Sequence, residues 1–510
     1  MKHFYTLFVC LLPLLTVAQV RNNQWVFGYD EDIPNQFGMS SLEFVYPDIF
    51  LSVYGYQNEP SWVGVGSSFV CDRNGKIALI SDNCSIYDHT FGVIEGGENM
   101  HGNSFSQGYC KTNSKIFGLW QTNILFPSSS ESNTYYQLYQ DLHMVDSLLG
   151  LASLNLMFNL IKKNEQGRFY IAKHDTISKN RYQVLYTVTP AYYDRKWYFY
   201  NMDNKSNTYH MYSIDESNNK VDTLFSQNIG EPLQRKDQQG TSGIFSPDLK
   251  TFSITVSGKG LMIFDFDIRT QLFSNSRFIY LPLYPRYGFS PGMAYSPNSR
   301  FVYVSTFGYD APGGNTNFLY QVDLQSNTSE LIATFFEPDE VGWPIGIGSI
   351  TQGPDCRLYV SPGSTTHFIH TIHHPDRKGA ACTFQPLAIN VPTLLFSNLP
   401  TFVTSGEDCD STYNWPFKPL GTHDSDLHDP GISLYPNPAS EYLFLRSEIT
   451  SPVDWSVYFY DARGTVVATQ HNISAPVTQL RIDLLTAGIY FYKICDTQGK
   501  ILKSGKIVKI

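Results

Sequence analysis

A short phrase recurs through the middle of the chain and constrains the fold more than any other feature. A turn reading Ser-Pro-Asp, Ser-Pro-Asn or Gly-Pro-Asp precedes a strand-like run, a short loop and a second strand-like run. The three clearest copies begin at Phe245, Tyr295 and Gly353, and a weaker copy begins at Cys71. A repeat of about 40–55 residues with paired strands is typical of a β-propeller, in which each copy forms one blade.

Length and composition agree with a repeated all-β fold. Without a leader and a C-terminal module, about 390 residues remain, too many for one compact core unless the fold repeats. At roughly 55 residues per blade, this length predicts a propeller of about seven blades. The chain has 34 Tyr and 35 Phe but only 16% charged residues, which favours aromatic-rich strands. The net charge of −10 argues against nucleic-acid binding.

The last part of the chain, residues 432–510, has a different pattern. Pro436 and Pro438 remove backbone donors and mark the start of a domain rather than the interior of a strand. The runs 442–445 and 489–494 then alternate between apolar and other residues, as half-buried strands do. Several short strands at regular spacing predict a small Ig-like β-sandwich.

These C-terminal motifs closely resemble the sorting domain of type IX secretion cargo in Bacteroidetes. The resemblance rests on Tyr-Pro-Asn-Pro, Ala-Gly-Ile-Tyr and the final Lys-Ile. It implies recognition by the type IX secretion machinery, transport of folded cargo across the outer membrane, and removal of the tail. The product is then released or attached to surface lipopolysaccharide. The alternative is an Ig-like accessory module without an address. The sorting signal that the resemblance implies comprises Tyr435, Pro436, Asn437, Pro438, Gly464, Gly488, Tyr490, Gly505, Lys506 and Lys509.

The remainder of the chain resembles a group of exported Bacteroidetes propellers with WD40-like repeats. The shared phrases are Asn-x-Trp-x-Phe-Gly at 23–28, Asp-x-x-Gly followed by Ser-Asp at 72–82, and Leu-Pro-x-Phe at 399–402. The resemblance spans most of residues 22–403 and is weaker near 30–70 and 150–240. It implies a fold and a location but no reaction.

The N-terminus reads as a signal peptide. Lys2 and His3 precede an apolar run from Phe4 to Leu15, and small residues follow up to Ala18. The run is too short for a membrane span, and we expect no transmembrane span elsewhere. The predicted organisation is a signal peptide at 1–18, a propeller at 19–405, a linker at 406–431 and a sorting domain at 432–510.

Seven of the eight cysteines lie beyond the leader, so at least one thiol is left without a partner in the chain. In an exported protein we expect disulfides, and proximity in sequence suggests Cys71–Cys84 and Cys356–Cys382. The sequence has no Cys-x-x-Cys motif, which argues against a zinc ribbon or a thioredoxin-like site.

The sequence contains no Gly-x-Ser-x-Gly, His-Glu-x-x-His, phosphate-loop or dinucleotide motif. Aromatic side chains beside an Asp and an Arg can line a sugar or peptide site. The ligand-binding candidates on this reasoning, together with two histidines, are His101, Tyr193, Asp194, Arg195, Trp197 and His370. No catalytic, cofactor or metal residue is predicted, and the cofactor is left open.

Other polar groups have a structural interpretation. His367, His370, His373 and His374 lie near Asp376 and could bind zinc or copper if they converged. Strand alternation instead places His367 and His373 on one face and His370 and His374 on the other. Asp248, Asn298 and Asp355 occupy the same place in each repeat, as turn caps would. Asp265 and Asp267 share a face and either end a strand or hold a cation.

Two functions remain at this stage. One is a secreted or cell-surface propeller that binds an extracellular glycan or protein without turnover, through loops at one mouth. The alternative is an extracellular hydrolase or lyase acting on a polymer at the propeller mouth, which requires an acid/base pair or a metal there. Convergence of His101, His174, Asp194, Arg195 and His370 at one mouth would favour the enzyme.

Overall fold

The fold was examined in a computed structural model. It describes residues 22–28, 37–56, 67–101, 107–108, 110, 123–146, 150–179, 190–203, 205–234, 242–282, 289–311, 314–335, 337–338, 344–363, 365–396, 399, 401, 403, 409, 411, 418–419, 433–435, 439–446, 455–461, 466–473, 477–495 and 501–510. The chain divides into two compact units, Met1–Lys418 and Pro419–Ile510. The predicted signal peptide lies outside the described residues, as do Pro436, Asn437, Pro438 and Gly464.

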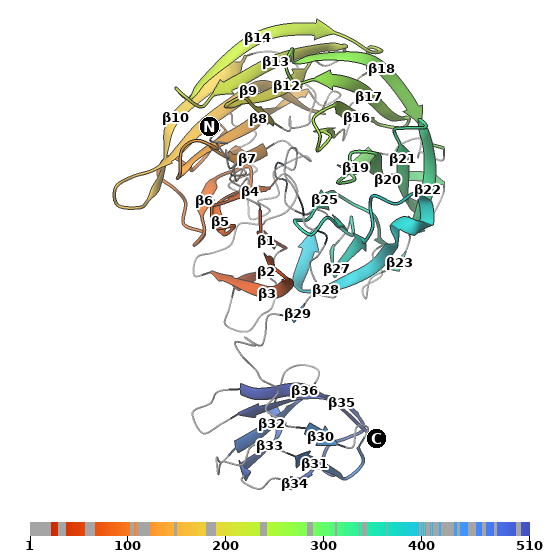
Figure 1. The fold of residues 1–510 in the computed structure, drawn as a ribbon. Coiled ribbons are helices and arrows are strands. Elements are labelled where there is room, and N and C mark those ends of the chain that lie inside the picture. The colour runs from red at the N-terminus through yellow and green to blue at the C-terminus, as the bar shows by residue number, and fades with distance from the viewer. Residues whose placement is uncertain are drawn as a thin grey trace, which may run out of the picture. The chain divides into compact units, whose positions relative to one another are not determined.

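Within the described part of the first unit, seven antiparallel sheets of three or four strands follow one another around a ring (Figure 1). The predicted all-β propeller is therefore confirmed. The first three sheets comprise β1 (Gln24–Phe27), β2 (Phe37–Val45), β3 (Asp48–Tyr56) and β29 (Lys418–Pro419); β4 (Ser68–Cys71), β5 (Ile77–Ser81) and β6 (Ile86–Asp88); and β7 (Asn123–Pro127), β8 (Thr134–Asp146), β9 (Gly150–Lys163) and β10 (Phe169–Ser178).

The fourth to seventh sheets each have four strands in chain order. They comprise β11 (Ala191–Tyr193), β12 (Lys196–Met202), β13 (Thr208–Asp215) and β14 (Lys220–Asn228); β15 (Gly243–Phe245), β16 (Thr251–Val256), β17 (Gly260–Asp267) and β18 (Leu272–Tyr280); β19 (Phe289–Tyr295), β20 (Phe301–Ala311), β21 (Gly314–Asp323) and β22 (Thr328–Phe335); and β25 (Ile350–Gln352), β26 (Leu358–Val360), β27 (Thr365–Ile372) and β28 (Phe384–Phe396). This unit also contains a small pair, β23 (Glu337–Pro338) and β24 (Pro344–Ile345), and a 3-10 helix, η2 (Gly379–Cys382).

Burial explains why these sequences form inner and outer strands. In the fifth sheet, β16 and β17 are buried along most of their length because neighbouring sheets cover both of their faces. The outer strand β18 instead alternates between exposed and buried residues. Aromatic rings fill the space between sheets, as where Tyr200 of the fourth sheet packs on Phe273 of the fifth with ring centroids 4.3 Å apart. The abundance of Phe and Tyr thus supplies the large side chains that a ring of packed sheets requires.

The recurring Ser-Pro-Asp phrase forms the turn between the first and second strands. The Ser246 hydroxyl donates to Asp248 Oδ1 at 2.7 Å, and Asp248 Oδ1 accepts the Lys250 amide at 3.2 Å. Asn298 accepts the amide of Arg300 at 3.0 Å in the next sheet, and Asp355 accepts that of Arg357 at 3.3 Å. The predicted turn-capping role of these three residues is confirmed.

The connections define two different faces of the ring. In sheets two to seven, first-to-second and third-to-fourth connections lie at one end of the strands because neighbours are antiparallel. Most of them are tight turns, such as Asp194–Arg195 and 268–271, and we call this end the short-turn face. The strand ends that the connections between sheets join lie at the other end, and these connections include 179–190 and 229–242. We call that end the long-loop face.

Two disulfides are present among the described residues, and both differ from the expected pairs. Cys84 bonds to Cys110 with a Cα–Cα distance of 5.6 Å, and Cys356 bonds to Cys409 with a Cα–Cα distance of 5.1 Å. Cys71 is instead buried, and its thiol donates to Gln24 O at 3.4 Å. Cys382 is a buried thiol in η2. The expected pairs were wrong because proximity in sequence does not show which residues the sheets bring together.

The second unit contains two antiparallel sheets. One has the order β30 (Ser433–Tyr435), β31 (Tyr442–Arg446) and β34 (Val477–Arg481). The other has the order β33 (Val466–Ile473), β32 (Trp455–Tyr460), β35 (Gly488–Cys495) and β36 (Ile501–Lys509). Their facing side chains, including Leu443, Phe459 and Ile507, form one core. This confirms the predicted small β-sandwich.

Candidate binding face and the closed channel

The chain that follows the last sheet passes through the middle of the ring. Figure 1 places β4, β7, β19 and β25 around that middle. The amide of Leu399 donates to Ser349 Oγ, just before β25, at 2.9 Å. Thr401 forms a parallel bridge with Ser68 at the start of β4. We call the stretch from Leu399 to Cys409 the central segment and describe it through Leu399, Thr401, Val403 and Cys409.

Specific contacts hold the central segment. The amide of Thr401 donates to Ser67 O at 3.2 Å, and the Ser68 hydroxyl donates to Thr401 O at 2.7 Å. Val403 is buried within the hydrophobic cluster of the third, fourth and fifth sheets. The Cys356–Cys409 disulfide then ties the segment to the turn between β25 and β26. The described residues of the segment therefore contact the seventh sheet, the second sheet and the cluster of the third to fifth sheets, and Cys409 lies at the short-turn face.

This arrangement limits where a ligand can bind. Leu399, Thr401 and Val403 lie among the inner strands, where a propeller channel would lie. Sequence reasoning noted the Leu-Pro-x-Phe phrase at the end of the ring but assigned it no role, and it placed Cys409 in the linker. A cysteine in a polar stretch was the signal that this stretch is fixed to the ring.

His101 lies between the second and third sheets and is 2% exposed. Its ring Nε2 donates to Asn83 O at 2.7 Å, and its Nδ1 lies 3.4 Å from an Asp141 carboxylate oxygen. The ring also meets Tyr139 edge-on at 5.5 Å. These contacts place His101 in the packing between two sheets.

His370 lies in β27 of the seventh sheet and is fully buried. Its Nε2 donates to Gly346 O at 2.9 Å, while its Nδ1 accepts the Leu387 amide at 3.0 Å. Burial lowers the pKa of His370 to about 4, so the ring is neutral in the folded protein near pH 7. Both ring nitrogens are therefore bonded to backbone groups of the protein.

The remaining candidates lie in the fourth sheet. Trp197 is 2% exposed, and its indole N–H donates to Glu216 Oε1 at 3.1 Å. Asp194 and Arg195 form the exposed turn between β11 and β12, with φ values of 48° and 61°. Tyr193 precedes this turn and is 38% exposed. The six candidates thus come from several sheets, and only the fourth-sheet group is contiguous in sequence.

The side chains of the histidine-rich segment bond to separate partners. His367 Nδ1 donates to Val391 O at 3.2 Å, whereas His373 Nε2 donates to Gln385 Oε1 at 2.7 Å. Asp376 turns away and accepts the amide of Asn298 at 2.9 Å. In the part of the chain that the structure describes, no three His, Cys, Asp or Glu side chains are grouped as metal ligands.

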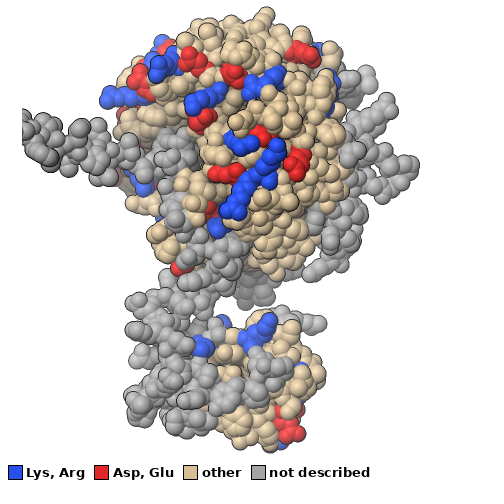
Figure 2. Space-filling view, turned by 45° about the vertical axis from the view of Figure 1, so that its right-hand side comes forward, with Lys and Arg blue, Asp and Glu red and all other residues tan. Residues whose placement is uncertain are grey.

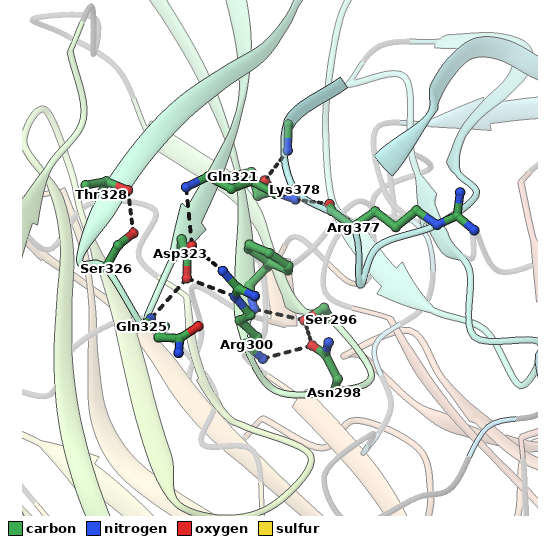
Figure 3. A network of polar contacts seen from close by, with 12 residues as sticks. Ser296, Asn298, Arg300, Gln321, Asp323, Gln325, Ser326, Thr328, Arg377 and Lys378 are labelled. Carbon is green, nitrogen blue, oxygen red and sulfur yellow. Dashed lines mark hydrogen bonds and ion pairs between the residues drawn. The ribbon is translucent and has the colours of Figure 1, made fainter. Parts of the chain in front are cut away.

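The loop 373–383 is the long exception on the short-turn face, and it fastens the seventh sheet to the sixth (Figure 3). Gln321 Nε2 donates to Arg377 O at 2.7 Å, and Gln321 Oε1 accepts the Gly379 amide at 2.8 Å. Arg300 donates to both carboxylate oxygens of Asp323, and Lys378 approaches the same group at 3.5 Å. The Arg300 guanidinium, as the largest cause, lowers the pKa of Asp323 to about 2.

Charged side chains on the visible side of the propeller are mixed in sign (Figure 2). Several charged residues of the described ring are paired, such as Lys250 with Asp248 at 3.4 Å and Lys196 with Asp215 at 3.3 Å. Asp265, a predicted cation ligand or strand end, pairs with Arg277 at 2.7 Å. Asp267 caps the next turn by accepting the Arg269 amide at 2.9 Å.

Residues 433–509 match a family model described as a secretion system C-terminal sorting domain. The chain carries a type IX sorting domain. This domain indicates export, with the protein either secreted or attached at the cell surface. Among the described residues, no helix is long and apolar enough to cross a membrane.

No curated protein sequence matches the chain. Among solved structures, a protein from Lactobacillus plantarum is 11% identical with a TM-score of 0.33, covering 90% of this chain and 99% of that chain. The Cps50 (Swd1) β-propeller domain of Myceliophteria thermophila is 11% identical with a TM-score of 0.30, covering 77% of this chain and 95% of that chain. Likenesses at these TM-scores say nothing about ligand or activity.

Proposed function

We propose that this protein is an exported propeller that binds an extracellular glycan or protein through its long-loop face, without turnover. The observation that carries the proposal is the central segment, which occupies the position of a channel site. A ligand is then left with the two ends and the outer rim of the ring. Of the two ends, the long-loop face has the longer and more varied connections, which suits recognition.

Two hairpins add to that face. Strands β8 and β9 run over Thr134–Asp146 and Gly150–Lys163, and β20 and β21 run over Phe301–Ala311 and Gly314–Asp323. The corresponding strands of the fifth sheet, β16 and β17, cover only Thr251–Val256 and Gly260–Asp267. The longer hairpins extend the wall of the long-loop face beyond the other sheets.

The tests use a purified chain of residues 19–510 on glycan and peptide arrays, with bound metal assayed on the same sample. In one variant, Asn-Gly replaces 309–315, shortening the β20–β21 hairpin with a dipeptide suited to a tight turn. The control variant carries Arg269→Ala and Thr270→Ala in an exposed turn of the short-turn face. We expect the hairpin variant to lose at least tenfold in affinity and the control variant to bind normally.

Equal binding by the hairpin variant and the wild type would reject this hairpin as part of the binding face. The alternative function, a hydrolase or lyase, is tested by incubating array hits with the wild type and measuring new chain ends. Release of products would reject binding without turnover and support the hydrolase or lyase.

A further inference from the structure

One sheet of the sorting domain is apolar on both faces. On its inner face, Val457, Phe459 and Ile494 are buried in the core. On its outer face, Phe491 is 48% exposed and Ile489 is 52% exposed. The outward face of a two-sheet sandwich is ordinarily polar, because strands alternate between core and water.

The strand register places the outer apolar residues side by side. Tyr460 of β32 lies opposite Phe491 of β35 on one side and opposite Val466 of β33 on the other. Val466 is 48% exposed. Ile489 shares the outward face of β35 with Phe491, two residues away. We call Tyr460, Val466, Ile489 and Phe491 the outer patch; together they cover three neighbouring strands.

Positive charge borders the outer patch. Lys506 of β36 lies opposite Phe491, and the Lys493 ammonium lies 5.4 Å from the centre of the Tyr460 ring. Lys residues occur in β35 and β36, and none of the strands β32, β33, β35 and β36 contains Asp or Glu. The whole chain, by contrast, has a net charge of −10. A basic border on an acidic protein selects a partner surface that is acidic.

The other sheet of the domain shows a different outer face. There Tyr442 lies opposite Arg481, and Phe444 lies opposite Gln479. On its other side Phe444 lies opposite Tyr435. The exposed large apolar residues of the two sheets differ: Tyr442 is exposed here, whereas Val466, Ile489 and Phe491 are all exposed in the outer patch. Contiguous apolar surface of this kind marks interaction sites.

We propose that the outer patch is the docking surface through which the secretion machinery recognises this domain. The partner is a protein of that machinery with an apolar centre that receives Phe491 and Ile489. Carboxylates around this centre face Lys493 and Lys506. The proposal rests on the sorting domain and not on ligand binding by the propeller.

Export from the native host tests this proposal. One variant carries Ile489→Ser and Phe491→Ser, and a second carries Lys493→Glu and Lys506→Glu. The control variant, Tyr442→Ser, removes a side chain that is 38% exposed on the other sheet. The periplasmic fraction is compared with the surface and medium fractions, and purified chains are checked by thermal unfolding and gel filtration.

We expect both patch variants to accumulate at least tenfold in the periplasm, with melting temperatures unchanged and Tyr442→Ser exported normally. If the serine variant has a lowered melting temperature, its export defect could come from unfolding. The charge-reversal variant then tests recognition, because its two substitutions lie at the border of the outer patch. Normal export of the charge-reversal variant would overturn the proposal. A dimeric wild type with a monomeric patch variant in gel filtration would also overturn it, because the outer patch would then join two copies of the chain. The patch variants recovered from the periplasm are also tested on the glycan and peptide arrays. Normal ligand binding by these variants would show that a loss of export is independent of the proposed binding function.

Discussion

Cys409 is bonded to Cys356, which lies 53 residues earlier in the turn between β25 and β26. The chain between Val403 and Cys409 therefore begins inside the ring and ends at its short-turn face. The bond joins the last part of the propeller to the seventh sheet. It also places the start of the tether to the sorting domain at a fixed point of the ring.

Removing this bond should loosen the central segment. With both Cys356 and Cys409 changed to Ser, we expect a loss of about 2–4 kcal/mol in the free energy of unfolding, as for other disulfides that close long loops. The Thr401 amide, which donates to Ser67 O, should exchange faster with deuterated solvent. The control changes Cys84 and Cys110 to Ser and should leave exchange at Thr401 unaltered. Equal exchange in both variants would contradict this role of the bond.

Acid should destabilise the protein through His370. In the unfolded chain this histidine takes up a proton near pH 6.5, whereas in the folded chain its pKa is lowered to about 4. The stabilisation is therefore complete above pH 6.5 and is lost as the pH falls from 6.5 towards 4. The loss amounts to about 3 kcal/mol for this one group.

Urea unfolding at pH 7.5, 5.5 and 4.5 measures this effect. His370→Asn should be less stable at pH 7.5, because the Gly346 carbonyl and the Leu387 amide lose their partner. It should also show a shallower decline with acid. His174→Asn, at an exposed position, is the control and should keep the slope of the wild type. An unchanged slope in His370→Asn would assign the acid sensitivity to other groups.

Gly292 lets the sixth and seventh sheets approach closely. A Cβ built on Gly292 would lie 2.5 Å from Gly348 O and 2.6 Å from Ile350 N. Both are backbone atoms, so Gly292→Ala requires the inner strands to separate. We expect a loss of about 1–3 kcal/mol, the usual range for overpacking. Gly92→Ala is the control, because its nearest contact would be an ordinary 3.5 Å; a similar loss in both variants would contradict the explanation.

The parts of the fold that follow from local chemistry could be predicted from the sequence. The cap that Asp248 forms in its own turn depends on residues within a few positions. That local rule, repeated along the chain, was sufficient to identify blades. The alternation of β35 similarly depends only on which face of the strand meets the core.

The site could not be predicted in the same way, because it depends on contacts between distant segments. His370 resembles a surface ligand in sequence, yet the backbone at Gly346 and Leu387 surrounds it. Nothing near Cys356 indicates that Cys409 returns to it through the ring. The packing of whole sheets determines whether these groups are buried. The pattern of apolar and polar residues along a single strand does not predict it.

Gly505 belongs to the predicted sorting signal, and its place in the domain explains why a larger residue should fail there. A Cβ on Gly505 would lie 2.6 Å from the Tyr492 hydroxyl and 2.7 Å from its ring carbon. Tyr492 is only 8% exposed, so its ring has little room to move. Gly505→Ala should therefore destabilise the sorting domain by about 1–3 kcal/mol and reduce export.

Gly488→Ala, where the nearest side-chain contact would be 3.8 Å, is the matched control within the same signal. Thermal unfolding and the periplasmic fraction are measured for both variants. If Gly488→Ala blocks export while the domain melts normally, the signal is read at Gly488 itself. If only Gly505→Ala blocks export and melts early, that glycine serves the fold on which recognition depends.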